Sequence, residues 1–241
     1  MATNKFSDSF LEALGMWQNG WSEDQQSRLA LANVLLNEAR ELPTEFRTVS
    51  EACYRKRFLQ TNEVIPLLFR SLHDGITSWT TNRTVAEEFK YRMRPGTITG
   101  VVFRYEPQSE DVVVNVPALW ATAEFAKAAE NYRTRKMPMA DALFHFLGGR
   151  NQFEVVLNVP LYPENIVTLS GETNTSFDEF CQQANLPILL EDTAWKALLA
   201  GDLQPQAAAL LRDVAAQKVI HQVIDRLTEL LETAHQPTVM R

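Results

Sequence analysis

Two polar side chains at the start of an apolar segment, Gln152 and Glu154, are the residues of this sequence best placed to do chemistry. The segment 151–159 follows a Gly-Gly pair and ends before a proline, a pattern typical of a buried strand entered from a tight turn. Since successive strand side chains point to opposite faces, the amide and the carboxylate are expected to point together, with Phe153 on the other face. Such a pair either belongs to a functional site or only contacts water at the start of the strand.

A second predicted strand carries basic residues. The run 49–59 alternates apolar and aromatic side chains with three basic ones, of which Arg55 and Arg57 fall on one face. An arginine on a mostly buried strand costs free energy unless it meets an anion. Arg55 is therefore expected either to pair with a carboxylate or to bind a phosphate of a ligand.

The third group is a pair of hydroxyl side chains followed at once by a short helix. Residues 76–81 are rich in β-branched and aromatic side chains and predict a strand on which Ser78 and Thr80 share a face. The sequence from Thr84 has the form of a capping box and predicts a helix that runs through Phe89. The predicted order is strand, turn and short helix.

Other segments must hold these three groups in place. Helical periodicity predicts helices at 22–41, 119–132 and 141–147, with an amphipathic turn around 6–14. Further strands are predicted at 98–105, 112–116 and 166–169. From Ser176 onward the period becomes helical and ends in a long amphipathic segment that includes Leu210 and Leu231.

Length and composition limit the class of protein. With 241 residues, 45% of them hydrophobic, the chain can bury a core, and we predict one globular unit with additions at both ends. No run approaches the roughly 18 apolar residues of a membrane span, and the first residues lack a secretory signal, so we expect a cytoplasmic protein without membrane contact. Cys53 and Cys181 are predicted to be free thiols in the core.

Several enzyme classes lack their usual sequence signals in this chain. It contains no Gly-rich phosphate loop, no Cys-x-x-Cys pair, no histidine pair at metal-ligand spacing and no Gly-x-Ser-x-Gly elbow. P-loop enzymes, kinases, zinc hydrolases and α/β-hydrolases are therefore disfavoured, and we expect no metal.

Taken together, the three polar groups resemble the arginine, Ser-Thr-Ser and glutamate pattern of the ADP-ribosyltransferase toxins and their relatives. The pattern is carried by Tyr54-Arg55, by Ser78-Trp79-Thr80 and by Gln152-x-Glu154, in that order. The resemblance covers about residues 49 to 170, and its specificity comes from order and spacing because each motif alone is short.

This resemblance implies an α+β fold. Its core is a split, twisted β-sandwich that binds NAD as a co-substrate and transfers ADP-ribose with release of nicotinamide. We place this core at residues 47–172, with a helical N-terminal extension at 1–46 and a helical C-terminal extension at 173–241.

The resemblance also implies catalytic roles. Glu154 resembles the catalytic glutamate and Gln152 the position that orients the acceptor. Cleavage of the bond between nicotinamide and ribose passes through an oxocarbenium-like transition state, and an ionised carboxylate near the ribose stabilises that positive charge. Glu154 is the residue that would supply this charge.

The implied NAD-binding positions lie on the two earlier groups. Arg55 resembles the arginine that anchors NAD, with Arg57 as the alternative anchor, and the backbone at Lys56 stands where the family favours a glycine that holds the nicotinamide amide. Three further positions are implied to brace or line the site: Ser78, Thr80 and Phe89.

Gln152 and the distribution of charge bear on the acceptor. A neutral amide suits a nucleobase amine or a side-chain amide better than it suits arginine. The chain has a net charge of −7, yet residues 47–150 carry 15 basic and 11 acidic side chains. We expect a nucleic-acid base, in RNA or single-stranded DNA, contacted by the following basic and aromatic residues: Arg83, Lys90, Arg92, Arg94, Arg133, Arg135, Lys136, Arg150, Tyr91 and Tyr132.

An enzyme that modifies nucleic acid in its own cell is harmful unless it is controlled. We therefore expect a bacterial toxin of the toxin-antitoxin or anti-phage kind, whose helical extensions are available to an antitoxin or chaperone. An NAD glycohydrolase, an enzyme that modifies a protein side chain, and an inactive module that keeps only the NAD cleft are the alternatives.

Overall fold

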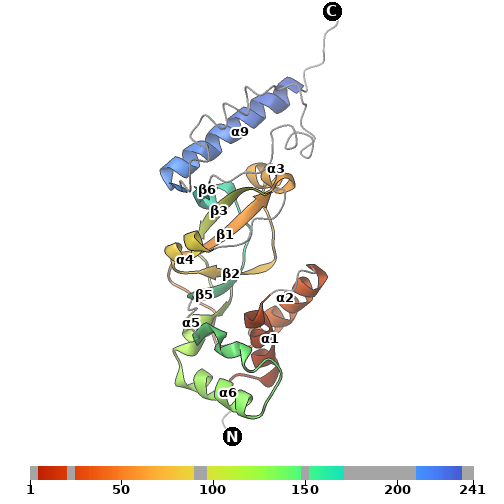
Figure 1. Ribbon diagram of the computed structural model, residues 1–241, viewed down its shortest axis with the longest axis vertical. Coiled ribbons are helices and arrows are strands. Elements are labelled where there is room, and N and C mark those ends of the chain that lie inside the picture. The colour runs from red at the N-terminus through yellow and green to blue at the C-terminus, as the bar shows by residue number, and fades with distance from the viewer. Residues whose placement is uncertain (1–4, 21–24, 90–96, 148–151, 171–209, 235–241) are drawn as a thin grey trace, which may run out of the picture. The chain divides into compact units, whose positions relative to one another are not determined.

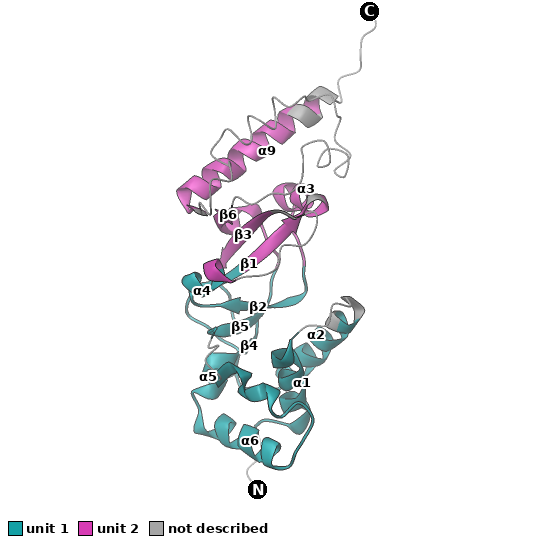
Figure 2. Cartoon of the chain, in the orientation of Figure 1, with its two compact units in different colours: residues 1–55, 74–86, 105–159 teal, residues 56–73, 87–104, 160–241 magenta. Residues whose placement is uncertain are grey.

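The computed structural model describes residues 5–20, 25–89, 97–147, 152–170 and 210–234. These residues form helices and antiparallel strands, so the predicted α+β class is confirmed. They divide into two compact units, shown in different colours in Figure 2. Unit 1 comprises residues 1–55, 74–86 and 105–159, and unit 2 comprises residues 56–73, 87–104 and 160–241.

Unit 1 contains three neighbouring antiparallel strands in the order β4-β5-β2. Their bounds are Ile76–Thr80 for β2, Val112–Asn115 for β4 and Glu154–Asn158 for β5. The middle strand β5 is buried through Val155, Val156 and Leu157, which explains why its sequence is continuously apolar. The first residues of β1 (Cys53–Gln60) also belong to this unit, where Tyr54 pairs with Thr80.

Unit 1 also contains four helices, which Figure 2 shows on the side of its strands where β4 and β5 lie. Their bounds are Asp8–Asn19 for α1, Gln25–Ala39 for α2, Val116–Trp120 for α5 and Ala123–Thr134 for α6, with short 3-10 segments at Thr44–Phe46 and Ala142–Leu147. The single helix predicted at 119–132 is two helices. The reason is a new N-cap, because the Thr122 side chain accepts a hydrogen bond from the backbone N–H of Phe125 at 3.3 Å.

The N-terminal helices share one hydrophobic core with the strands of unit 1. Phe6, with its ring centroid 5.4 Å from that of Phe46 and 5.1 Å from that of Phe125, lies in a buried cluster that also contains Val114 and Val156. Burial of this apolar surface stabilises both parts together. The described residues from 5 to 46 thus pack in unit 1 together with strands of the segment that we predicted to be the core.

Unit 2 is built from the strands β3, β6 and β7 in that antiparallel order. The bounds are Thr97–Tyr105 for β3, Ile166–Ser170 for β6, Leu210–Arg212 for β7, Thr61–Phe69 for α3 and Val214–Ala234 for α9, while α4 (Arg83–Glu88) spans the two units. Helix α9 packs on β6 and β7 (Figure 1), and Gln217 on its first turns donates to the carbonyl of Ile166 at 2.6 Å.

Two sequence expectations in unit 2 were wrong. Leu210 belongs to a short strand instead of the long predicted helix, which begins only at Val214, after Asp213 turns the chain with a φ of 48°. Residues 61–69 form an unpredicted helix, in spite of Pro66, because Gln60 and Glu63 make a capping box at its start. The predicted helices between residues 176 and 199 lie outside the described residues.

Two further expectations concern cysteine and the membrane. Cys53 is a buried free thiol, as predicted, whereas Cys181 lies outside the described residues. In the described parts of the chain, every helix is too short or too polar to cross a bilayer.

Candidate functional site

Glu154 opens β5, and three hydrogen-bond donors hold its carboxylate. Ser78 Oγ on the neighbouring strand β2 donates to Oε1 at 2.5 Å, and the indole Nε1 of Trp17 on α1 donates to the same oxygen at 2.9 Å. Gln18 Nε2, also on α1, donates to Oε2 at 2.6 Å. Hydrogen bonds to an ionised carboxylate are short and strong, so this side chain is fixed in one orientation.

Strand register explains why Ser78 meets Glu154. Thr80 pairs directly with Glu154 and Ser78 with Val156, so Ser78, Thr80 and Glu154 all point to one face of the β2-β5 pair. The two hydroxyl groups differ in what they contact. Ser78 bonds the carboxylate, whereas Thr80, which is 7% exposed, accepts a hydrogen bond from the backbone N–H of Asn82 at 3.1 Å and so supports the turn after β2.

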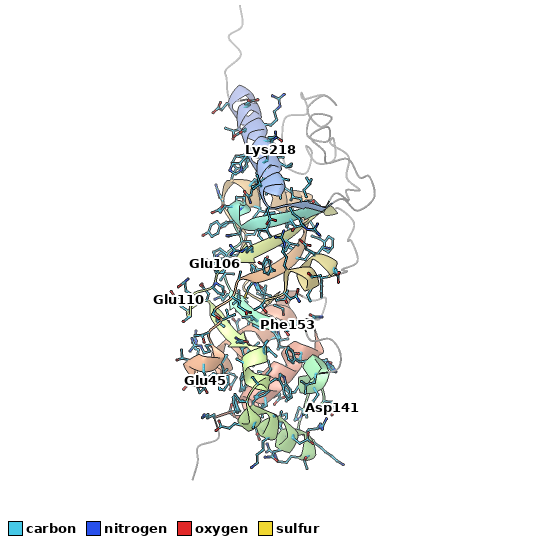
Figure 3. All side chains as sticks on the ribbon, turned by 90° about the vertical axis from the view of Figure 1, so that its left-hand side faces the viewer. Glu45, Glu106, Glu110, Asp141, Phe153 and Lys218 are labelled. Carbon is cyan, nitrogen blue, oxygen red and sulfur yellow. The ribbon has the colours of Figure 1, made fainter. Side chains whose placement is uncertain are left out.

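The backbone turns sharply just before Glu154. Phe153 has a φ of 50°, a left-handed conformation that is strained for an aromatic residue and is common at functional sites. The predicted strand alternation from Gln152 to Glu154 is therefore wrong, because the strand begins only at Glu154. Gln152 is exposed and Phe153, labelled in Figure 3, keeps 39% of its surface exposed.

A pocket of about 460 Å³ lies beside Phe153 in unit 1. Its lining combines this aromatic residue with mostly polar residues around the ends of the neighbouring strands: Thr48, Val49, Ser50, Glu51, Thr81, Asn115 and Pro117. Thr81 N–H donates to the carbonyl of Phe153 at 3.3 Å and links the pocket wall to the turn before Glu154. The pocket thus has an aromatic residue next to hydrogen-bonding residues in its lining.

Arg55 meets a carboxylate in this structure. Its guanidinium lies 2.9 Å from Asp74, and the two side chains are 19% and 18% exposed. Tyr54 lies in one cross-strand row with Thr80 and Glu154, so strand alternation places Arg55 on the opposite face from Tyr54. We expected Arg55 either to pair with a carboxylate or to bind a ligand phosphate, and Asp74 provides the carboxylate.

The remaining predicted NAD-binding residues belong to unit 2. Lys56 donates through Nζ to the carbonyl of Glu87 at 2.8 Å, and Phe89 is 43% exposed just after α4. The alternative anchor, Arg57, forms an ion pair of 2.6 Å with Glu63 of α3. Arg55, Ser78, Thr80, Gln152 and Glu154 thus share unit 1, whereas Lys56 and Phe89 do not.

The predicted nucleic-acid contacts need one correction. Tyr132 is fully buried and its hydroxyl donates to the carbonyl of Pro138 at 3.0 Å, so its ring is not available for stacking. Arg135 is held by Asp8 through two hydrogen bonds, and these hold the pKa of Asp8 below its ordinary value. Arg133 pairs with Glu130 at 2.6 Å. Four predicted basic contacts and one aromatic contact lie outside the described residues: Lys90, Arg92, Arg94, Arg150 and Tyr91.

Sequence reasoning assigned no chemistry to the helix that carries Trp17 and Gln18. Trp17 continues the apolar spacing of Phe10 and Leu14 on α1, so its sequence context indicates only a core residue. It is indeed 4% exposed, yet its indole N–H reaches a carboxylate from β5. A buried tryptophan needs an acceptor for this N–H, but the sequence does not say which group supplies it.

Comparison of the chain with models of protein families, with curated proteins and with solved structures gives no match. Within residues 5–20, 25–89, 97–147, 152–170 and 210–234, no three His, Cys, Asp or Glu side chains are arranged to hold a metal ion.

Proposed function

We propose that the protein is an NAD-dependent mono-ADP-ribosyltransferase. The observation that carries this proposal is the Glu154 carboxylate, which Ser78 of the neighbouring strand orients at 2.5 Å. This is the relation between hydroxyl strand and glutamate that the ADP-ribosyltransferase resemblance implies. The proposed fold of the core is accordingly the split β-sandwich of that family.

In the proposed reaction, the bond between the nicotinamide nitrogen and C1′ of the ribose breaks, and its electron pair leaves with nicotinamide. The ionised Glu154 stabilises the positive charge that develops on the ribose and accepts a hydrogen bond from a ribose hydroxyl. An amine nitrogen of the acceptor then forms the new bond to C1′ and loses one proton to water.

Arg55 is proposed to bind the pyrophosphate of NAD. A guanidinium binds phosphate through two parallel hydrogen bonds, and Arg55 already holds an anion, Asp74, at 2.9 Å. Binding of NAD would then require the phosphate to share or replace this carboxylate.

The proposed acceptor is a nucleobase with an exocyclic amine, in RNA or single-stranded DNA. Gln152 is exposed two residues before Glu154 and can both donate and accept hydrogen bonds. Phe153 supports the proposal in place of Tyr132, because this aromatic residue is partly exposed and lines the 460 Å³ pocket, and bases stack on aromatic side chains.

The proposal is tested by incubating the purified protein with NAD labelled in its adenosine part and a cell extract. We expect nicotinamide release and a labelled product that nuclease destroys and protease leaves intact. Label that only protease destroys would make a protein side chain the acceptor. Nicotinamide release without labelled macromolecule would indicate an NAD glycohydrolase.

A variant pair ties the reaction to Glu154. Glu154→Gln keeps the size of the side chain and removes its charge, so nicotinamide release should fall at least about a hundredfold. Glu164→Gln makes the same change at an exposed position of unit 2 and should leave the rate unchanged. Equal activity in the two variants, or no nicotinamide release by the unchanged protein, would rule out the proposed function.

A further inference from the structure

We propose that helix α1 completes the active site through two neighbouring residues with different tasks. Trp17 is a positioning residue that fixes Oε1 of Glu154, and Gln18 occupies Oε2 until a ribose hydroxyl of NAD replaces it. This inference rests on the proposed function and assigns a role to a helix that the ADP-ribosyltransferase resemblance does not cover.

The two carboxylate oxygens of Glu154 have different surroundings. Oε1 accepts from Ser78 at 2.5 Å and from Trp17 at 2.9 Å, so it already has two donors. Gln18 donates to Oε2 at 2.6 Å. With two donors Oε1 has no room for another, so a substrate hydroxyl must approach Oε2, the oxygen at which the Gln18 amide already stands.

Burial separates the tasks of Trp17 and Gln18. Trp17 is 4% exposed within the core of unit 1, so its indole has little freedom and holds Oε1 in one place. Gln18, one position further along α1, is only half-buried. Its flexible side chain can turn away from the carboxylate, and its amide then exchanges the carboxylate for water.

Close packing fixes the position of α1 itself. A Cβ added at Gly15 would lie 2.6 Å from the carbonyl oxygen of Met139, which shows how tightly the helix lies on the loop before the 3-10 segment at Ala142–Leu147. Trp17 follows half a turn later on the same helix. The contact with this loop therefore fixes the position of α1, and with it the position from which the Trp17 N–H donates to Glu154.

Steady-state nicotinamide release by the full-length protein tests both roles. Trp17→Phe removes the indole donor and should lower kcat about ten- to a hundredfold while KM for NAD changes less than about twofold. Trp120→Phe is its matched control, because Trp120 packs edge-on against Phe125 in the same unit and makes no contact with Glu154 among those described. This control should keep kcat.

Gln18 variants test the exchange at Oε2. Gln18→Ala and the larger Gln18→Leu both remove the donor, and each should lower KM for NAD about three- to tenfold with kcat within about twofold, because no bond must be broken when NAD binds. Asn19→Ala changes the next, exposed side chain and should leave both constants unchanged.

Specific outcomes would overturn the inference. Equal kcat values for Trp17→Phe and Trp120→Phe would remove the positioning role of Trp17. A loss of kcat in both Gln18 variants would show that Gln18 is not replaced by substrate, and this test holds even if Trp17→Phe does not fold. Absence of nicotinamide release by the unchanged protein would instead refute the proposed function itself.

Discussion

The indole nitrogen of Trp17 lies 2.9 Å from Oε1 of Glu154, although the two residues are 137 positions apart in the sequence. Trp17 belongs to a helix that shares its core with β4 and β5, and Glu154 is the first residue of β5. The carboxylate is thus oriented by an N-terminal helix as well as by the neighbouring strand. The proposed chemistry at Glu154 depends on both.

Removal of the Ser78 hydroxyl should affect activity more than stability. Ser78→Ala deletes the donor to Oε1 of Glu154, and the loss of a hydrogen bond to a charged group predicts a kcat about ten- to a hundredfold lower. Thr77→Val is the control on the opposite face, where the Thr77 hydroxyl accepts from the Trp79 indole at 3.0 Å. It should lower the free energy of unfolding by about 1 kcal/mol and leave kcat unchanged. Rate assays and urea unfolding of both variants decide this.

Arg55 and Arg57 offer a matched pair for the NAD anchor. Arg55 forms an ion pair with Asp74 and Arg57 one with Glu63, at similar exposure, so Arg55→Ala and Arg57→Ala should lose comparable stability. Only Arg55→Ala is expected to raise KM for NAD, by about ten- to a hundredfold, because the ADP-ribosyltransferase resemblance assigns the NAD anchor to Arg55. A raised KM in Arg57→Ala alone would transfer the anchor to Arg57.

Gly15→Ala should destabilise the protein even though alanine favours helices by about 1 kcal/mol over glycine. The new Cβ would lie 2.6 Å from the Met139 carbonyl oxygen, so helix and loop must separate, at a cost of about 1–3 kcal/mol. Gly20→Ala is the comparison, since no atom lies within 4 Å of its added Cβ and only the φ of 99° opposes it. In urea unfolding, a Gly15→Ala protein as stable as the unchanged one would contradict the packing described for α1.

Cys53 should resist alkylation in the folded protein. Burial, with a smaller effect of the Glu51 carboxylate, raises the pKa of its thiol from an ordinary value near 9 to about 12. Iodoacetamide at pH 8 should therefore modify Cys53 in urea but not in buffer, as measured by mass spectrometry of its peptide.

The same thiol predicts a loss of stability at high pH. Above pH 9 the unfolded thiol ionises while the folded one stays protonated, so the unfolded state binds fewer protons and stability falls as the pH rises toward 12. Between pH 9 and 11 the free energy of unfolding of Cys53→Ala should fall less steeply than that of the unchanged protein. Parallel slopes for the two proteins would contradict this account of Cys53.

The parts of the site that follow from strand periodicity could be predicted from the sequence. Alternation in residues 76–81 places Ser78 and Thr80 on one face, and the structure places Glu154 on that face too. The φ of 50° at Phe153 could not be predicted, because aromatic residues rarely adopt it and no local pattern signals it. Alternation therefore gave the wrong strand start at Gln152.

Contacts between distant segments could not be predicted from the sequence, for a different reason. Apolar spacing on α1 identifies Trp17 as a core residue, but it does not identify the group that accepts its N–H. Likewise, Tyr132 directly precedes a basic stretch that suggested a surface, whereas its side chain on helix α6 is buried in the core. Both depend on tertiary packing, which periodicity alone does not contain.

The separation of Trp17 and Glu154 along the chain also determines when the site can form during synthesis. Translation delivers α1 early, and the residues of β5 follow only after more than half of the chain has been made. Until Glu154 has left the ribosome, a nascent chain holds the indole and the Ser78 hydroxyl but lacks the carboxylate that they orient. The proposed enzyme is therefore inert throughout the first half of its own translation.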